Sequence, residues 1–406
     1  MKESLGQVAN SNKYLIIIYF FMITTPFYFF PSQYPLFTVF FVIMFIVYYK
    51  KEVFVQLKVA FINKALILIG LYFLYTYLAL LWTSNIEHGF AVQKVYREAL
   101  FYIPILYIFL NQKTAEISLK LFCIGFGLYA LYSIGYYLEF YQYGASTKDN
   151  PQGHLGYETV TVMMSLGVFF SSIFYYFESN NKMKYLFLFI FIVCLIGLGI
   201  NNGRAAQLSF LLVLITLIII YRKNIFSKKT LIVFLSSIII LGVVFYKHKD
   251  RFEIGYLELK KVVVEKKYEG SWGIRAYMYL TGIKIIKENP FFGVGSGDSK
   301  DTYRLIASKE NSPHAWFSHM HNQHIELLSR YGFVGYSLLL ISVIYLLYSI
   351  RENRKFFILG LVFYLTIFYN SFFNTLLDRK PIYILFFVIF ALLAILNKKD
   401  IKSINN

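Results

Sequence analysis

Long apolar runs alternate with short polar links along almost the entire chain. A run of about twenty apolar residues is long enough to cross a lipid bilayer as a helix. The pattern predicts twelve membrane spans, at about 13–30, 35–49, 65–82, 93–111, 120–141, 157–178, 185–201, 205–221, 230–246, 333–350, 356–375 and 381–397. The chain is therefore predicted to be an all-α, polytopic membrane protein.

The composition agrees with this class. Of the 406 residues, 58% are hydrophobic and 20% are aromatic, and aromatic rings are favoured at the surfaces of a bilayer. The net charge of +18 does not indicate nucleic-acid binding, because most lysines and arginines stand in alternate links between apolar runs. By the positive-inside rule these basic links are cytoplasmic, which puts both termini in the cytoplasm. The basic links contain Lys50, Lys51, Lys58, Lys64, Lys113, Lys120, Lys182, Lys184, Arg222, Lys223, Lys228, Lys229, Arg351, Arg354, Lys355, Lys398, Lys399 and Lys402.

The other face has one long polar segment, residues 247–320, which is predicted to be periplasmic in a Gram-negative cell. A surface helix is expected at 251–267 and an amphipathic helix at 272–288. The apolar face of the second helix would be formed by Ala276, Tyr279, Ile283 and Ile286. The chain thus divides into spans one to nine (1–246), a loop domain with the candidate chemistry (247–332), and spans ten to twelve with a cytoplasmic tail (333–406).

A glycine-rich stretch, FFGVGSGDSK, follows Asn289-Pro290 at the end of the second helix. Three glycines in five residues predict a turn. A glycine-rich loop can also cradle phosphate, although this one lacks the spacing of a nucleotide-binding loop. The sequence leaves both interpretations open.

Four of the seven histidines fall within eleven positions just before the tenth predicted span: His314, His319, His321 and His324. Histidine titrates near neutrality, so the cluster indicates proton transfer, metal binding, or interfacial histidines without chemistry. A metal site would need more ligands than the histidines, and the only carboxylate close by is Glu326. No metal is therefore expected.

Charged side chains at the outer ends of the spans are a second candidate feature. Arg204 follows the short outer link Asn201–Gly203, where a positive charge opposes the positive-inside rule. It is either a snorkelling arginine at a helix end or an anion receptor with a planar fork. Arg275, in the second helix of the long segment, is either a solvated side chain or a receptor of the same kind. Lys94 and Arg97, at the outer start of the fourth span, are further candidates.

Arginines and a histidine beside a membrane are what a lipid-linked diphosphate substrate requires. The arginines would neutralise the leaving diphosphate, and the histidine would take the proton from an attacking hydroxyl.

These residues also resemble a known family. His321-Asn322, followed after nine residues by Gly332 and after two more by Gly335, is similar to the H-[NSQ]-x9-G-x-x-[GTY] signature of O-antigen ligases and related Wzy-type polysaccharide polymerases. GRAAQLSF, with Arg204, and WGIRAYMYLTGIKIIKENPFFGVGSGD, with Arg275, resemble the family's two arginine-bearing segments. The resemblance is best from the seventh to the tenth predicted span.

The resemblance implies a glycosyltransferase of the bacterial inner membrane, with a GT-C-like, all-helical architecture of about twelve spans, a large periplasmic loop between spans nine and ten, and no cofactor. The donor would be a glycan on undecaprenyl diphosphate, and the acceptor a sugar hydroxyl of the lipid A core. His321 would be the general base, Arg204 and Arg275 would hold the diphosphate, and Asn322 would orient the base or the acceptor. The additional histidines His319 and His324 leave open which histidine acts.

The spacing of the glycines allows two geometries. On a continuous helix, His321, Leu328, Gly332 and Gly335 would lie near one face, and the glycines would let a neighbouring helix approach. With a break at Gly332, the glycines would form a hinge.

Three other functions are considered beside the ligase. A Wzy-type polymerase would use the same donor, arginines and histidine, but another lipid-linked repeat unit as acceptor. A protein-glycosylating relative is a third member of the group. A transporter or flippase for lipid-linked glycans would bind phosphate through Arg204 without making a bond, and it would predict internal symmetry, which the sequence does not display.

Overall fold

The computed structural model of the protein describes residues 12–27, 39, 60–142, 146–148, 150–221, 242, 246, 249–317 and 319–397. Within these residues the fold is all-helical, and the only β contact is an isolated bridge between Thr147 and Asn150. The α-helices are α2 (Asn12–Thr24), α5 (Lys64–Leu78), α6 (Ile86–Phe109), α7 (Gln112–Tyr137), α8 (Tyr157–Phe177), α9 (Asn181–Ile200), α10 (Arg204–Tyr221), α12 (Lys249–Glu265), α13 (Gly270–Glu288), α14 (Ser299–Lys309), α15 (Gln323–Ser349), α16 (Arg354–Asn370) and α17 (Lys380–Leu396). Two short 3-10 helices, η1 (Ala79–Trp82) and η2 (Leu376–Asp378), complete the described elements.

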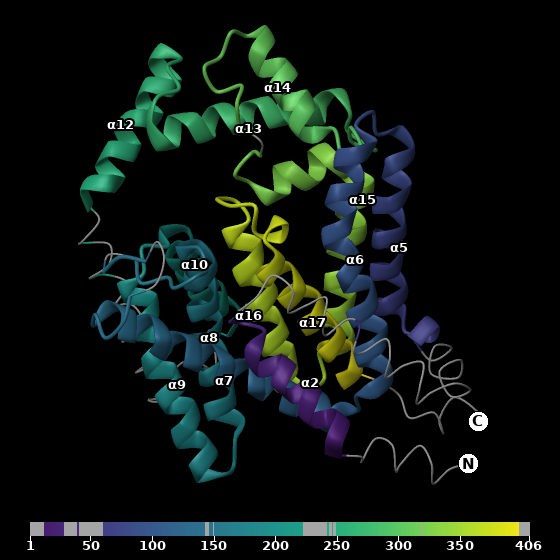
Figure 1. The fold of residues 1–406 in the computed structure, drawn as a ribbon, viewed down its shortest axis with the longest axis vertical. Coiled ribbons are helices and arrows are strands. Elements are labelled where there is room, and N and C mark those ends of the chain that lie inside the picture. The colour runs from purple at the N-terminus through teal and green to yellow at the C-terminus, as the bar shows by residue number, and fades with distance from the viewer. Residues whose placement is uncertain are drawn as a thin grey trace.

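The helices form a bundle and a layer. Helices α12, α13 and α14 lie across one end of the bundle that is formed by the other α-helices (Figure 1). We call this the site end, because the histidine cluster also lies there, at the start of α15. Links that join helices at the site end include 79–85, 201–203 and 371–379, whereas 110–111, 178–180 and 350–353 lie at the opposite end.

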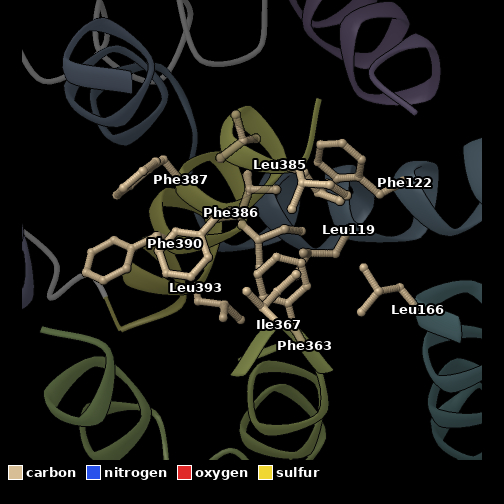
Figure 2. Close-up of a cluster of buried hydrophobic side chains, with 14 of the residues drawn as sticks. Leu119, Phe122, Leu166, Phe363, Ile367, Leu385, Phe386, Phe387, Phe390 and Leu393 are labelled. Carbon is tan, nitrogen blue, oxygen red and sulfur yellow. The ribbon is translucent and has the colours of Figure 1, made fainter. Parts of the chain in front are cut away.

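Helix α17 is the centre of the bundle. Every residue from Pro381 to Ile395 is buried, as expected for a helix that is apolar on all sides and surrounded by other helices. Figure 2 shows part of the surrounding cluster, in which Phe386 and Leu385 of α17 face side chains of α7, α8 and α16. Pro381 stands in the first turn of α17, where its missing N–H costs nothing.

Asparagine side chains begin several of the helices by accepting otherwise unpaired backbone N–H groups. Asn63 caps α5, Asn111 forms a capping box with Thr114 at α7, and Asn180 caps α9. Ion pairs then fix the end of the bundle opposite the site. Lys120 of α7 is 2.6 Å from Glu178, and Lys355 of α16 is 2.7 Å from Glu116 of α7.

Six of the described helices are long and apolar enough to cross a membrane, namely 64–82, 112–137, 157–177, 181–200, 204–221 and 323–349, and shorter apolar helices lie at 15–24 and 380–396. These helices confirm an all-helical, polytopic membrane protein. The predicted spans 35–49 and 230–246 lie outside the described residues, apart from residues 39, 242 and 246, so the predicted count of twelve remains a prediction.

The predicted start of the tenth span at residue 333 coincides with a break at Gly332 inside α15, whose first part begins at Gln323. The apolar face predicted for 272–288 was wrong in part, because Ile283 is 40% exposed whereas Met278 and Ile285 of α13 are fully buried. Gly282 explains the difference, since its missing side chain leaves room for Ile325 and Met320 to pack against this face of α13.

Candidate active site

His321 lies immediately before the cap of α15 and not on a helix. The Asn322 side chain accepts the Ile325 N–H at 3.1 Å and so begins the helix at Gln323. His321 has a φ of 49°, in the left-handed region that a side chain with a β-carbon rarely adopts. The predicted helical face through His321 and the two glycines therefore does not form.

Two other parts of the chain hold this segment in place. The Tyr279 hydroxyl of α13 is 2.7 Å from the Phe372 carbonyl and 3.3 Å from the His321 carbonyl. Residues 371–379, which link α16 to α17, make the remaining bonds: Asn322 Nδ2 donates to the Phe372 carbonyl at 3.2 Å, Gln323 N to the Ser371 carbonyl at 2.8 Å, and Leu377 N to Gln323 Oε1 at 2.8 Å. The histidine is thus positioned by α13, by α15 and by the 371–379 link.

The four clustered histidines have different surroundings. His324 uses both ring nitrogens, at 3.0 Å from the Phe368 carbonyl and 2.8 Å from the Tyr336 hydroxyl. His314 bonds to the Tyr268 carbonyl at 2.8 Å. His319 Nδ1 is 3.4 Å from the His321 N–H, and the two rings meet edge to face at 4.2 Å. Among the described residues no hydrogen-bond partner is found for the His321 ring, so its nitrogens remain available to a substrate.

The electrostatic surroundings keep His321 neutral. Burial, the neighbouring His319 and the positive charges of Arg275 and Arg379 together lower the pKa of His321 from 6.5 to about 3. A neutral imidazole can accept a proton, whereas a protonated one cannot. This histidine is consequently in the form that a general base requires at neutral pH.

The predicted cations are distributed unequally around the histidine. Arg275 is half-buried on α13, one turn before Tyr279, and within the described part of the chain its guanidinium has no ion pair or hydrogen bond. Arg204 is the exposed first residue of α10, next to Gly203, and no contact between it and His321 is found. Lys94 and Arg97 are exposed on α6, likewise without a recorded contact to His321.

Arg379 is a residue that the sequence reasoning missed. It caps the start of α17, its side chain is 34% exposed, and it forms an ion pair with Glu158 of α8. The signal that could have found it is the one applied to Arg204: a positive charge in a short link that the positive-inside rule assigns to the outer face.

The glycine-rich stretch after α13 is a turn that fills a break in α15. Gly332 has a φ of 61° and a ψ of −168°, which interrupts the helix at the position that the sequence left open. Residues 290–295 supply the missing partners through four backbone bonds: Val294 N to Ser329 O (2.9 Å), Gly295 N to Arg330 O (3.0 Å), Phe333 N to Pro290 O (2.8 Å) and Val334 N to Phe291 O (3.1 Å). The N–H groups of Val294 and Gly295 are occupied, which favours the turn over a phosphate cradle.

A buried charge network lies next to the histidine segment, in the first turns of α15. Arg330 of α15 is 3.0 Å from Asp378 and 2.8 Å from Glu326, whose other oxygen accepts the Met320 N–H at 3.2 Å. Ser299 of α14 donates to Glu326 at 2.9 Å. Because Glu326 is committed to these partners, it is not available to complete a metal site with the histidines.

Within the described residues, no group of three or more histidine, cysteine, aspartate or glutamate side chains is arranged to hold a metal ion. A cavity of about 580 Å³ opens at the opposite end of the bundle, at the start of α16, and is lined by Glu116, Phe177 and residues 352–356. It contains none of the predicted site residues.

Comparison with known proteins adds one match. Residues 187–340 match the family model described as O-Antigen ligase. A search of curated proteins finds no match. The matched region includes Arg204, Arg275, His321 and Gly332, but it ends before Arg379.

Proposed function

Residues 187–340 belong to the O-antigen ligase family, and from this premise we propose that the protein transfers a glycan from undecaprenyl diphosphate to a sugar hydroxyl of the lipid A core. The family supports a membrane enzyme that acts on lipid-linked glycans by ligation or polymerisation. The choice of the ligase reaction is our proposal.

In the proposed reaction, the acceptor oxygen attacks the anomeric carbon of the donor sugar. A carbon–oxygen bond forms to the acceptor while the bond from the anomeric carbon to the diphosphate oxygen breaks, and the configuration inverts. The acceptor proton moves to a ring nitrogen of His321, and Arg275 and Arg204 stabilise the negative charge of the departing diphosphate. Asn322 fixes the backbone that carries His321, and the reaction needs no metal.

The observation that carries this proposal is the environment of His321. The imidazole is half-buried, and its ring has no hydrogen-bond partner among the residues described, so a ring nitrogen is open to an acceptor hydroxyl. His324, in contrast, donates its Nε2–H to the Phe368 carbonyl, so only its Nδ1 could accept a proton, and Nδ1 is already bonded to the Tyr336 hydroxyl. These differences favour His321 over His319 and His324 as the base.

A polymerase remains the second candidate, because the matched family and the three site residues serve it equally well. In both cases we propose the bacterial inner membrane, with both termini in the cytoplasm and the site end of the bundle in the periplasm. The two reactions differ in their acceptor, which is a sugar of the lipid A core for the ligase and a lipid-linked repeat unit for the polymerase.

The test is transfer by the purified protein in liposomes that contain an undecaprenyl diphosphate-linked glycan and excess chelator. One sample receives lipid A core as acceptor and the other receives only lipid-linked glycan. We expect product with lipid A core, and a loss of about 100-fold or more in His321→Ala, as for removal of a general base. His314→Ala, which alters a histidine bonded to Tyr268, serves as the matched control and should retain activity.

Three results would contradict the proposal. Elongated lipid-linked glycan without transfer to lipid A core would identify a polymerase. Activity of His321→Ala close to that of His314→Ala would reject the general base. Loss of activity in chelator that a divalent ion restores would reject the metal-free reaction.

A further inference from the structure

We propose that Arg379 is a third arginine ligand of the lipid-linked diphosphate and that Glu158 is the positioning residue that orients it. This inference rests on the proposed function and deepens it, because it adds a donor-binding residue that lies outside the region matched by the family model.

The first argument is position. Arg379 ends the 371–379 link, and the same link bonds to Asn322 through the Phe372 carbonyl and to Gln323 through the Ser371 carbonyl and Leu377 N–H. The positive charge of Arg379 acts on His321, as that of Arg275 does. The two arginines therefore belong to one electrostatic site, although they are more than 100 residues apart in the chain.

The second argument is the way in which Arg379 is held. Its Nη2 pairs with Glu158 Oε2, and its Nη1 is 3.5 Å from Thr159 Oγ1. The other Glu158 oxygen accepts a hydrogen bond of 2.9 Å from the Asn374 amide, when this amide points its nitrogen toward α8. Glu158 is thus fixed on both oxygens by the same link that carries Arg379.

Exposure distinguishes the two partners. The Glu158 side chain is only 11% exposed, whereas the Arg379 side chain is 34% exposed. A guanidinium has five N–H donors in a planar fork, and Glu158 with Thr159 engages only part of that fork. The carboxylate is covered by protein, and the arginine keeps donors that can reach an anion.

The third argument is the charge of the whole site. Gly203 packs directly against Thr161 of α8, so Arg204 lies beside the same end of α8 as Glu158 and Arg379. Three arginines, at 204, 275 and 379, and one carboxylate, Glu158, leave two positive charges. A diphosphate diester carries two negative charges, so the site and the ligand are electrostatically complementary.

An ion pair that only stabilises the fold is the alternative, and a double variant separates the two roles. Glu158→Gln together with Arg379→Gln removes both charges, leaves the net charge of the site unchanged and replaces the ion pair by two amides that can bond to each other. Lys380→Gln is the matched control, because Lys380 is the adjacent cation and pairs with Glu98 of α6 at 2.7 Å.

The experiment measures binding of undecaprenyl diphosphate and of undecaprenyl monophosphate to the purified full-length protein in nanodiscs, together with the KM for donor and for acceptor. In Arg379→Gln and in the double variant we expect diphosphate binding to weaken by about tenfold or more, as for the loss of charged hydrogen bonds. We expect the donor KM to rise while the acceptor KM stays within about twofold, and Arg379→Lys to recover part of the affinity through its charge.

Wild-type diphosphate binding by the double variant, or an equal loss in Lys380→Gln, would overturn the role of Arg379. Failure of the proposed function looks different. In that case the wild-type protein would form no lipid A core product, whatever effect Arg379→Gln has on diphosphate binding.

Discussion

At the scale of single residues, hydrogen bonding decides which histidine of the cluster is free to react. His314 and His324 bond to backbone carbonyls on other parts of the chain, which fixes their rings as structural groups. His321 is held through its backbone instead, by Tyr279 and by the capping residue Asn322. Its ring is therefore positioned while the ring nitrogens stay free of hydrogen bonds to the described residues. Such an arrangement combines a fixed location with an open acceptor atom.

The lowered pKa of His321 predicts an unusual pH dependence. With a pKa of about 3, the free protein keeps this imidazole neutral through the range from pH 8 to 5. A bound diphosphate offsets the charges of Arg275 and Arg379, which raises the pKa of His321. Because kcat/KM reports the free enzyme and kcat reports the complex, kcat should fall at a higher pH than kcat/KM as the solution is acidified.

Steady-state transfer rates measured from pH 5 to 8 check this order. Arg275→Gln should move the acidic fall in kcat to higher pH, because it removes one of the positive charges that lower the pKa of His321. A kcat/KM profile that falls with a midpoint near 6.5 in the wild-type protein would contradict the prediction.

Sequence reasoning at this scale singled out His321 and Arg275 as candidates but did not consider Arg379. The histidine signature and the arginine-bearing segments stand out because their spacing can be read along the chain. Arg379 is brought to the site by the turn between α16 and α17, and its partner Glu158 is more than 200 positions away. Only the positive-inside rule could have drawn attention to Arg379, because it makes a positive charge in a short outer link unexpected.

At the scale of elements, α15 depends on the turn that fills its break. Gly332 has a positive φ, and a β-carbon there would collide with the carbonyl group of Phe291. The strand-like exchange of hydrogen bonds satisfies the backbone groups that the break leaves without partners inside the helix. The sequence allowed a break at Gly332, but periodicity could not reveal which segment fills it, because residues 290–295 lie more than 30 positions earlier in the chain.

Gly332→Ala should therefore destabilise the protein strongly. With a φ of 61° and a ψ of −168°, this backbone conformation is almost restricted to glycine and costs on the order of 1–3 kcal/mol for a residue with a β-carbon, and the collision with Phe291 adds to this. Gly70→Ala is the matched control, since a β-carbon on Gly70 of α5 meets nothing within 4 Å and alanine favours helices.

Thermal unfolding of the two variants in the same detergent tests this contrast. We expect a markedly lower Tm for Gly332→Ala, and a Tm equal to or slightly above that of the wild type for Gly70→Ala. Equal Tm values for the two variants would show that the break in α15 imposes no conformational demand.

At the scale of the whole molecule, the two ends of the bundle differ in character. The site end carries the α12–α14 layer (Figure 1), and the histidine segment and Arg379 lie there too. The opposite end carries basic side chains such as Lys120 of α7 and Lys355 of α16. By the positive-inside rule we propose that this end faces the cytoplasm. The orientation remains a prediction from the charge distribution along the sequence, which depends on composition and not on packing.

Cysteine labelling provides a direct test of the orientation. The native Cys123 and Cys194 are both buried and give little background. Lys309→Cys places a thiol on the exposed end of α14, and Glu352→Cys places one in the exposed link between α15 and α16. In intact spheroplasts a membrane-impermeant maleimide should label position 309 only, and position 352 should react after permeabilisation. The reverse pattern would place the site in the cytosol.

The four backbone hydrogen bonds between residues 290–295 and α15 also connect α13 and α15 mechanically. Two of them reach α15 before its break, at Ser329 and Arg330, and two reach it after the break, at Phe333 and Val334. They therefore tie the C-terminal end of α13, the helix that carries Arg275, to both halves of α15, the helix that follows His321. The helix of the guanidinium and the helix of the imidazole are thereby braced against each other, and a load placed on one is shared by the other.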